Sequence, residues 1–170
     1  MKIKNLNFFA NLILSRTPNA KAEIVGGPLA PNIRGTVNFY EVYNGTLVVA
    51  EIYNLPRMVP GSGSTPPIGP FGFHIHEGHS CEMGDPADPF KAAGAHFNPT
   101  GKSHPAHAGD MPVLFSDGRG YAYLAFYTER FTPGQVVGRT VIIHQNPDDY
   151  RSQPAGNAGK RLACGVIMEH

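Results

Sequence analysis

Short runs of β-branched and aromatic residues, each ended by glycine, proline or asparagine, are the feature that most limits how this chain can fold. The run at residues 36–43 is followed by Asn44-Gly45, a dipeptide typical of two-residue hairpins, and a second run returns over residues 46–53. No stretch shows the apolar period of a long amphipathic helix. We therefore predict an all-β chain of about eight antiparallel strands, folded as a Greek-key β-sandwich or barrel. The expected strands are residues 20–25, 36–43, 46–53, 71–76, 113–115, 121–127, 140–144 and 163–168.

Two stretches, residues 77–112 and 145–160, follow neither a strand nor a helix period and are rich in glycine, proline and polar residues. The whole chain holds 20 glycines and 16 prolines among 170 residues, which favours long irregular connections. Loops of this length inside compact domains are commonly functional. We expect a single domain over residues 20–170, with its function carried by these two loops.

Residues 1–19 form an N-terminal extension in this interpretation. Their apolar residues are interrupted by Asn7 and Asn11 and followed closely by Arg16, which makes a poor secretory signal. We therefore expect a cytoplasmic protein, with secretion or the cell envelope as the alternative. A net charge of +1 without a Lys/Arg run predicts no nucleic-acid partner. The lack of an apolar stretch of roughly 18 residues predicts no membrane partner.

Histidines are the side chains that point most clearly to chemistry. His74 and His76 are two residues apart on a predicted strand, so their imidazoles share one face and can address one ion. Without further evidence, this pair is equally consistent with a metal site and with two surface histidines. His144 ends the predicted strand at residues 140–144, and alone it would be interpreted as structural.

A second cluster lies in the first long loop. His96, His104, His107 and Asp110 fall within fifteen residues of a segment rich in glycine and proline. Three imidazoles and a carboxylate suit zinc, which has no geometric preference from its d electrons. The alternative is a solvated histidine-rich loop without a metal.

Two cysteines, Cys81 and Cys164, lie far apart in the sequence. Two cysteines cannot form a zinc ribbon, which needs four ligands from paired motifs. They could form one bridge or remain two buried thiols, and the count alone favours neither.

Motifs in order along residues 20–167 resemble copper/zinc superoxide dismutases, in particular their bacterial members. GFHIHE at residues 72–77 resembles that family's copper-binding strand, and HFNP at residues 96–99 resembles its bridging-histidine segment. HAGD at residues 107–110 is similar to its zinc-binding end, and GNAGKRLACGVI at residues 156–167 is close to its C-terminal signature. The resemblance implies one copper and one zinc per chain. It places copper on His74, His76, His96 and His144, and zinc on His96, His104, His107 and Asp110.

The same resemblance implies an activity: superoxide is converted to dioxygen and hydrogen peroxide as copper is alternately reduced and reoxidised. His96 would bridge both metals and take up a proton when its bond to reduced copper breaks. Arg161 would guide and hold the superoxide anion beside copper, since a guanidinium stays charged at any relevant pH. Asp148 would link a copper histidine to a zinc histidine, and Cys81 and Cys164 would form the family's intrasubunit disulfide.

Several positions depart from the family pattern. The insert at residues 82–95 is long in a region that family dimers often use, so the resemblance leaves a homodimer open. Only two residues separate His104 from His107. Pro154 and Ala155 stand where many members have lysine and threonine, so Lys160 or Arg151 would assist Arg161. His79 is interpreted as an exposed loop residue.

Two other functions are compatible with these ligands. A copper and zinc storage or delivery protein of the same fold would need no arginine beside the metal. A purely structural zinc domain would leave His74, His76 and His144 without a role.

Overall fold

The strands form from short runs rich in β-branched and aromatic residues, and buried and exposed residues alternate along some of them. The computed structural model describes residues 16–170, so most of the expected N-terminal extension lies outside the described residues. In β5, for example, Ala122 is buried and Tyr123 exposed, and this alternation continues along the strand. The strands are β1 (Ala20–Gly26), β2 (Arg34–Val42), β3 (Gly45–Tyr53), β4 (Phe73–His76), β5 (Ala122–Thr128), β6 (Thr140–His144) and β7 (Arg161–Glu169). Two short helices, η1 (Lys91–Ala93) and α2 (Pro133–Val136), complete the elements.

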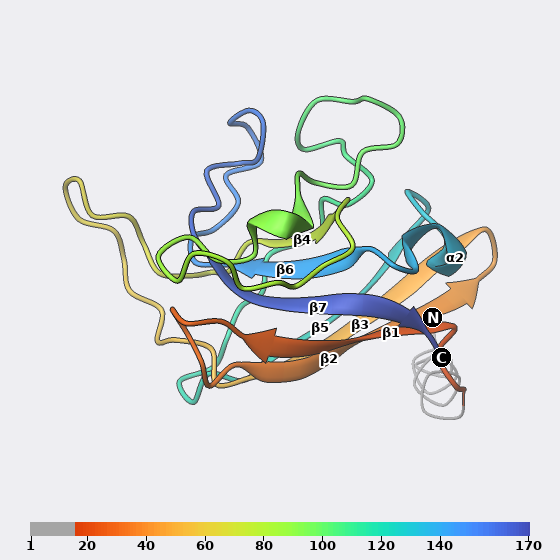
Figure 1. Cartoon of the computed structure of the whole chain (residues 1–170), viewed down its shortest axis with the longest axis horizontal. Helices are drawn as coiled ribbons and strands as arrows, with labels where there is room; N and C mark the ends of the chain where they lie inside the picture. The colour runs from red at the N-terminus through yellow and green to blue at the C-terminus, as the bar shows by residue number, and fades with distance from the viewer. Residues whose placement is uncertain (1–15) are drawn as a thin grey trace, which may run out of the picture.

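All seven strands belong to one antiparallel sheet with the order β4-β6-β7-β1-β2-β3-β5. The sheet curls into two layers, and Figure 1 shows β4, β6 and β7 above β1, β2, β3 and β5. The core lies between these layers. It includes Phe39 of β2, Ile52 of β3, Ile75 of β4 and Ile143 of β6, all without exposed surface. The predicted all-β antiparallel fold is confirmed.

The expected eighth strand at residues 113–115 is reduced to an isolated bridge between Leu114 and Phe71. Val113 donates its backbone N–H to the Tyr150 hydroxyl instead of a strand partner, and Phe115 is 66% exposed. Regular pairing therefore stops after one residue. The segment still runs beside the chain leading into β4 and continues through a turn into β5.

The first hairpin also differs by one residue from the expected turn. Val42 pairs with Gly45, so Tyr43 and Asn44 form the turn and Gly45 begins the returning strand. A Cβ on Gly45 would lie 2.3 Å from the Thr128 carbonyl oxygen of β5. Gly45 thus permits a close approach of β3 to β5.

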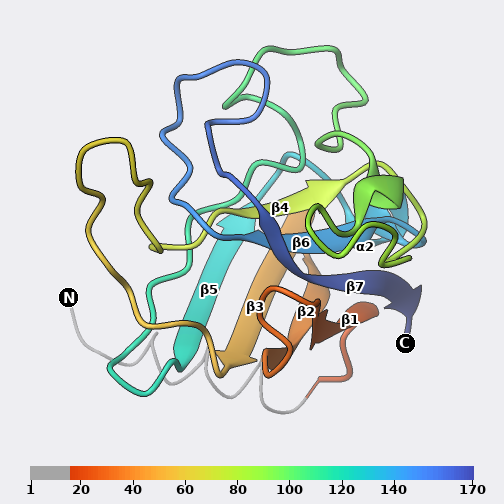
Figure 2. The same cartoon turned by 60° about the vertical axis from the view of Figure 1, so that its left-hand side comes forward.

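The two long loops project from the same side of the sheet. In Figures 1 and 2, the green loop around residue 100 and the blue loop around residue 150 both lie above β4 and β6. A disulfide between Cys81 and Cys164 joins the start of the first loop to β7, as the resemblance implied. Phe90, Ala93 and Ile142 pack with these cysteines in a small separate cluster. The first loop is therefore fixed to the sheet both covalently and by packing.

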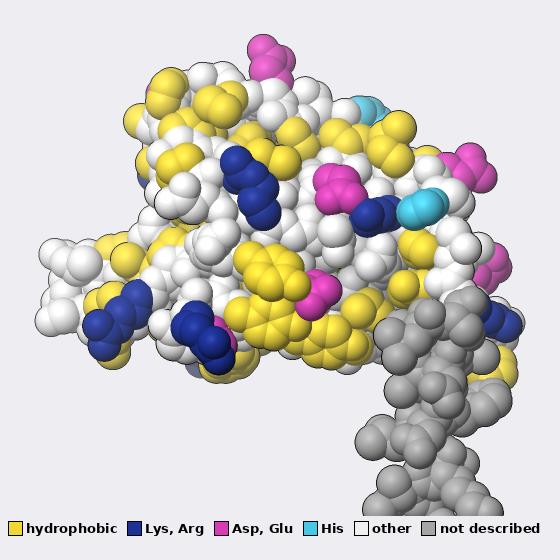
Figure 3. Space-filling view, turned by 90° about the horizontal axis from the view of Figure 1, so that it is seen from below, with side chains coloured by type: hydrophobic (Ala, Val, Ile, Leu, Met, Phe, Trp, Pro, Cys, Tyr) yellow, Lys and Arg dark blue, Asp and Glu magenta, His cyan; other side chains and the backbone are white. Residues whose placement is uncertain are grey.

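The outer face of the lower layer carries the aromatic residues that alternation leaves outside. Hydrophobic side chains gather over this face in the view from below (Figure 3). Tyr53, Tyr123 and Tyr127 are each at least 45% exposed, and the rings of Tyr53 and Tyr121 lie 5.2 Å apart. Within the described residues, no helix has the length and apolar character required to cross a membrane.

Candidate metal centre

Strand β4 presents its two faces to different environments. Phe73 and Ile75 point into the core, so His74 and His76 point to the opposite face, where the long loops cover them. Both histidines are at most 1% exposed. The alternation that buries one face of β4 therefore places both imidazoles under the loops.

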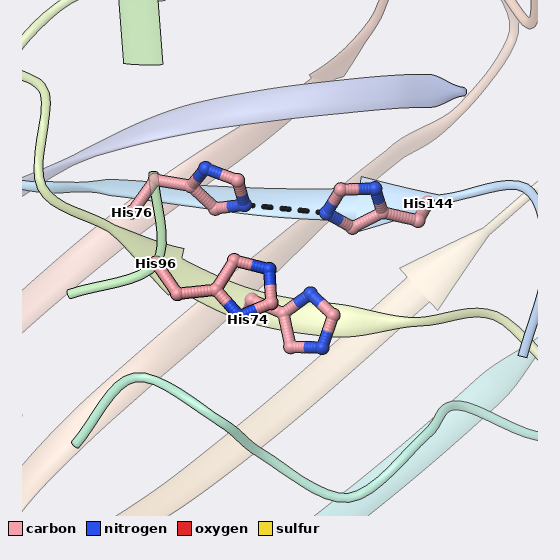
Figure 4. A group of neighbouring side chains, drawn as sticks. All are labelled: His74, His76, His96 and His144. Atoms are coloured by element: carbon pink, nitrogen blue, oxygen red, sulfur yellow. Dashed lines mark hydrogen bonds between the residues drawn. The ribbon is translucent and has the colours of Figure 1, made fainter. Parts of the chain in front are cut away.

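Two further histidines complete the group on this face. His144 ends β6 at an irregularity in its pairing with β7, and His96 pairs with His76 through an isolated bridge. Figure 4 shows the four rings turned toward one another. One nitrogen from each of His74, His76, His96 and His144 lies within 4.8 Å of all the others.

Hydrogen bonds at the outer edges of these rings fix which nitrogen carries the proton. His76 donates from Nδ1 to the Gly94 carbonyl at 2.9 Å, and His144 donates from Nδ1 to the Gly159 carbonyl at 3.3 Å. Their Nε2 atoms then carry lone pairs, and these two atoms lie 3.2 Å apart (Figure 4). Two lone pairs that face each other at this distance repel, and a bound cation would remove the repulsion.

Burial keeps these imidazoles from supplying that positive charge themselves. Desolvation lowers the pKa of His76 and of His144 well below the ordinary value for histidine. Desolvation also lowers the pKa of His74 to about 4, although Asp148 partly opposes the shift. His74, His76 and His144 are therefore neutral at physiological pH and suited to a metal ion.

The second group comprises His96, His104, His107 and Asp110, whose ligand atoms also lie within 4.8 Å of one another. Asp110 Oδ2 lies 3.1 Å from His104 Nδ1 and 3.3 Å from His107 Nδ1. Burial raises the pKa of Asp110, but the hydrogen bond from His96 and the nearby histidines outweigh it and lower the pKa to about 2. The site thus combines an ionised carboxylate with three imidazoles.

Several buried nitrogens of both groups have no hydrogen-bond partner among the described residues. They are His74 Nδ1, His96 Nε2, His104 Nδ1 and His107 Nδ1. Buried polar atoms are almost always paired, so four unpaired nitrogens in one place indicate that these atoms bind metal ions. A set of four imidazoles suits copper, and three imidazoles with a carboxylate suit zinc.

Asp148 connects the two groups from outside. Its Oδ2 accepts from His74 Nε2 at 2.7 Å, and its Oδ1 accepts from His104 Nε2 at 2.9 Å. Burial raises the pKa of Asp148, but its hydrogen bonds prevail and lower it. Gly156 makes room for this carboxylate, since a Cβ there would lie 2.0 Å from Asp148 Oδ1. The carboxylate directs the Nδ1 lone pairs of both histidines inward.

Comparison with known proteins agrees with this geometry. The family model for copper/zinc superoxide dismutase (SODC) matches residues 33–167. The chain belongs to this family. "Superoxide dismutase [Cu-Zn] 2" of Aquifex aeolicus (strain VF5) is 43% identical over 167 residues, covering 90% of this chain and 88% of that protein. "Superoxide dismutase [Cu-Zn]" of Deinococcus radiodurans is 37% identical over 153 residues, covering 80% of this chain and 78% of that protein.

A solved structure shares the superoxide dismutase fold. The crystal structure of the clock protein EA4 superposes with a TM-score of 0.70 at 29% identity, covering 91% of this chain and 97% of that one.

A cavity of about 710 Å³ opens from the copper group to the surface. His76, His96, His144 and Arg161 all line this cavity. Arg161 donates from Nη2 to the Gly94 carbonyl at 2.7 Å and from Nη1 to the Phe90 carbonyl. Burial lowers the pKa of Arg161 from its ordinary value, but a guanidinium remains charged. The cavity therefore carries a fixed positive charge beside the four histidines.

The insert at residues 82–95 borders this cavity. Its Asp88 and Lys91 line the opening and form an ion pair of 2.8 Å, and Lys160 lies 3.9 Å from the same carboxylate. Pro154 and Ala155 line the cavity too, whereas Arg151 does not line it in the part of the chain that the structure describes. Lys160 is not among its lining residues either, although it lies near Asp88, which is.

His79 is exposed and contacts Gly138 and Arg139 away from both ligand groups. The sequence interpretation missed several residues that orient the ligands: the Gly94 and Gly159 carbonyls, Gln153 and Arg130. Backbone acceptors leave no signal in a sequence. Gln153 and Arg130 act on other residues' backbone, so no motif identifies them either.

Proposed function

We propose that this chain dismutates superoxide, with copper held by His74, His76, His96 and His144 and zinc held by His96, His104, His107 and Asp110. The observation that carries the proposal is the convergence of unpaired, buried imidazole nitrogens, among them His96 Nε2, beside a cavity that both His96 and Arg161 line. Bound copper supplies the one-electron chemistry, since it can be reduced by one superoxide and reoxidised by the next.

Arg161 binds and orients the substrate in this proposal. Its two carbonyl contacts hold the guanidinium at the cavity wall, so the positive charge does not need to be ordered when the anion arrives. Charge focused in a cleft of this kind raises association rates by about 10 to 10³-fold. Storage of a metal would gain nothing from a cation held next to it.

His96 handles the proton. Its Nε2 is buried and unpaired among the described residues, while its Nδ1 contacts Asp110 Oδ1 at 2.7 Å. The ring therefore faces both ligand groups, and Nε2 is the atom that can hold a proton for the peroxide product. With Nδ1 and Asp110 both holding zinc, the ring would stay aligned while the proton moves.

The test is superoxide consumption followed by pulse radiolysis, with copper and zinc measured per chain. The proposal predicts a second-order rate constant approaching the diffusional ceiling of about 10⁹ M⁻¹ s⁻¹. The rate should rise in proportion to copper content. A fully metal-loaded, oxidised sample without activity would instead support a storage or delivery protein.

Oligomeric state and location are further parts of the proposal. The exposed tyrosines of β3 and β5 form an aromatic face that supports a homodimer, and sedimentation velocity would decide between monomer and dimer. We infer a cytoplasmic location, with the cell envelope or secretion as the alternative. The N-terminal sequence of the mature protein from native cells would distinguish them.

A further inference from the structure

The zinc ligands His104, His107 and Asp110 lie on one short loop segment that the strands hold at one end only. Gly109 accepts from the Ile75 N–H of β4 at 2.9 Å and donates to the Phe97 carbonyl at 2.9 Å, which anchors the end near Asp110. In the described chain, no backbone hydrogen bond joins residues 104–107 to a strand. That half of the segment must be held by side chains.

Gln153, from the second long loop, holds the segment at its beginning. Its Nε2 donates to the His104 carbonyl at 2.6 Å, and its Oε1 accepts from the His104 backbone N–H at 3.1 Å. The amide therefore pairs with both backbone groups of one zinc ligand, as a neighbouring strand would. Asp148 holds the ring of the same histidine, so Gln153 and Asp148 fix its backbone and its side chain separately.

Arg130, which follows β5, holds the segment through three of its backbone carbonyls. Its Nη1 lies 3.0 Å from the Pro105 carbonyl oxygen and 3.3 Å from those of His107 and Asp110. Cavities of about 670 and 370 Å³ flank this guanidinium, and Arg130 lines both. Arg130 therefore connects the segment to the end of β5.

We propose that Gln153 and Arg130 are positioning residues of the zinc site. They hold the backbone of residues 104–110 in the conformation in which its three ligands converge. The proposal rests on the zinc assignment made above and deepens it. It also explains how a loop with only two residues between His104 and His107 can present both rings to one ion.

The physical reason is preorganisation. A loop that is already ordered loses less conformational entropy when its ligands bind, so the metal is bound more tightly. The carbonyls of His107 and Asp110 belong to buried residues, and a buried carbonyl without a donor carries a desolvation cost. Removal of outer partners of metal ligands typically lowers metal affinity by about 10 to 100-fold.

The experiment measures zinc affinity of the full-length, disulfide-intact chain. Metal-free protein is titrated with zinc against a chromogenic chelator for the wild type, Gln153→Ala, Arg130→Ala and Arg130→Lys. Arg119→Ala is the matched control, because its side chain is 94% exposed on a turn far from both loops. Copper affinity of each zinc-loaded protein and unfolding of each metal-free protein are measured in parallel.

Gln153→Ala and Arg130→Ala should each raise the zinc dissociation constant by about 10 to 100-fold. Their copper affinity and metal-free unfolding should remain near wild type, and Arg130→Lys should recover part of the loss. Zinc dissociation constants that stay within about twofold of the wild-type value would overturn the proposal. Equal losses of zinc and copper affinity would overturn it too. A wild-type chain that fails to bind zinc would instead overturn the zinc assignment itself.

Discussion

The copper and zinc halves of this site are built in different ways. His74 and His76 lie on β4 and His144 ends β6, so strand pairing sets the spacing of three copper ligands. The zinc ligands His104 and His107 lie in a loop without strand pairing, and side chains outside the loop hold them. His96 belongs to both ligand groups.

The two halves therefore depend on different interactions: strand pairing in the copper half, and side-chain hydrogen bonds to a loop in the zinc half. Three of the copper ligands follow from the register of strands that also form the core. The zinc half depends on a few hydrogen bonds from Asp148, Gln153 and Arg130. We therefore expect the zinc half to be the more easily loosened of the two.

The largest expected effect separates the halves directly. His76→Ala removes a copper ligand and should lower copper affinity by more than about 100-fold, beyond the usual effect of an outer partner, while zinc still binds. His107→Ala should show the converse pattern, with zinc lost and copper retained. Metal content after dialysis, read by mass spectrometry, checks both. Equal loss of both metals in both variants would show that the halves are not separable.

Asp148→Asn should affect both halves at once, because Asp148 contacts one ligand from each. An amide can accept from only one of the two histidine N–H groups, so the other ring loses its orientation. We expect both affinities to fall by about 10 to 100-fold. Asp149→Asn is the control, since that carboxylate bonds Ser152 and Asn157 within its own loop. A change confined to one metal would contradict the connecting role.

Arg161→Ala should leave both halves loaded and lower the rate constant by about tenfold at low ionic strength. The rate should also become less sensitive to salt, since the guiding charge is gone. Arg161→Lys retains the charge and should recover part of the rate. Stopped-flow or pulse-radiolysis rates across a salt series provide the measurement, and an unchanged salt dependence would refute the guidance role.

The smallest effect concerns the metal-free protein and pH. The folded pKa of His74 is lowered to about 4 from 6.5, so between these values the unfolded chain binds a proton that the folded chain does not. The free energy of unfolding should therefore fall as pH is lowered from about 6.5 toward 4. Denaturant unfolding at a series of pH values tests this, and His144→Gln should give a shallower slope. A flat profile would mean that the copper histidines are not buried as neutral rings.

Much of the fold could be predicted from the sequence because the strands coincide with short runs of β-branched and aromatic residues between turn residues. The strand at residues 140–144 was placed correctly, since β6 spans Thr140–His144. The strand at residues 113–115 was not, because the Val113 N–H bonds to the Tyr150 hydroxyl. Tyr150 is distant in the sequence, and no local pattern reveals this competition.

The site could be predicted through its histidines because ligand chemistry is carried by side-chain type. The resemblance brought together the residues that the structure finds within ligand distance. Gln153 and Arg130 could not be predicted, because their partners are backbone atoms brought near only by folding. The inner ligands are therefore visible in the sequence, whereas their supports are visible only in the structure.

The most direct test of the account concerns His96, the residue that joins its two halves. Cobalt(II) would be placed in the zinc site of the copper(II)-loaded protein, and the copper signal followed by electron paramagnetic resonance. If one imidazolate bridges both ions, their unpaired electrons couple through it and the copper signal should be largely lost. A copper signal that remains at full intensity with cobalt bound would contradict the shared-ligand site.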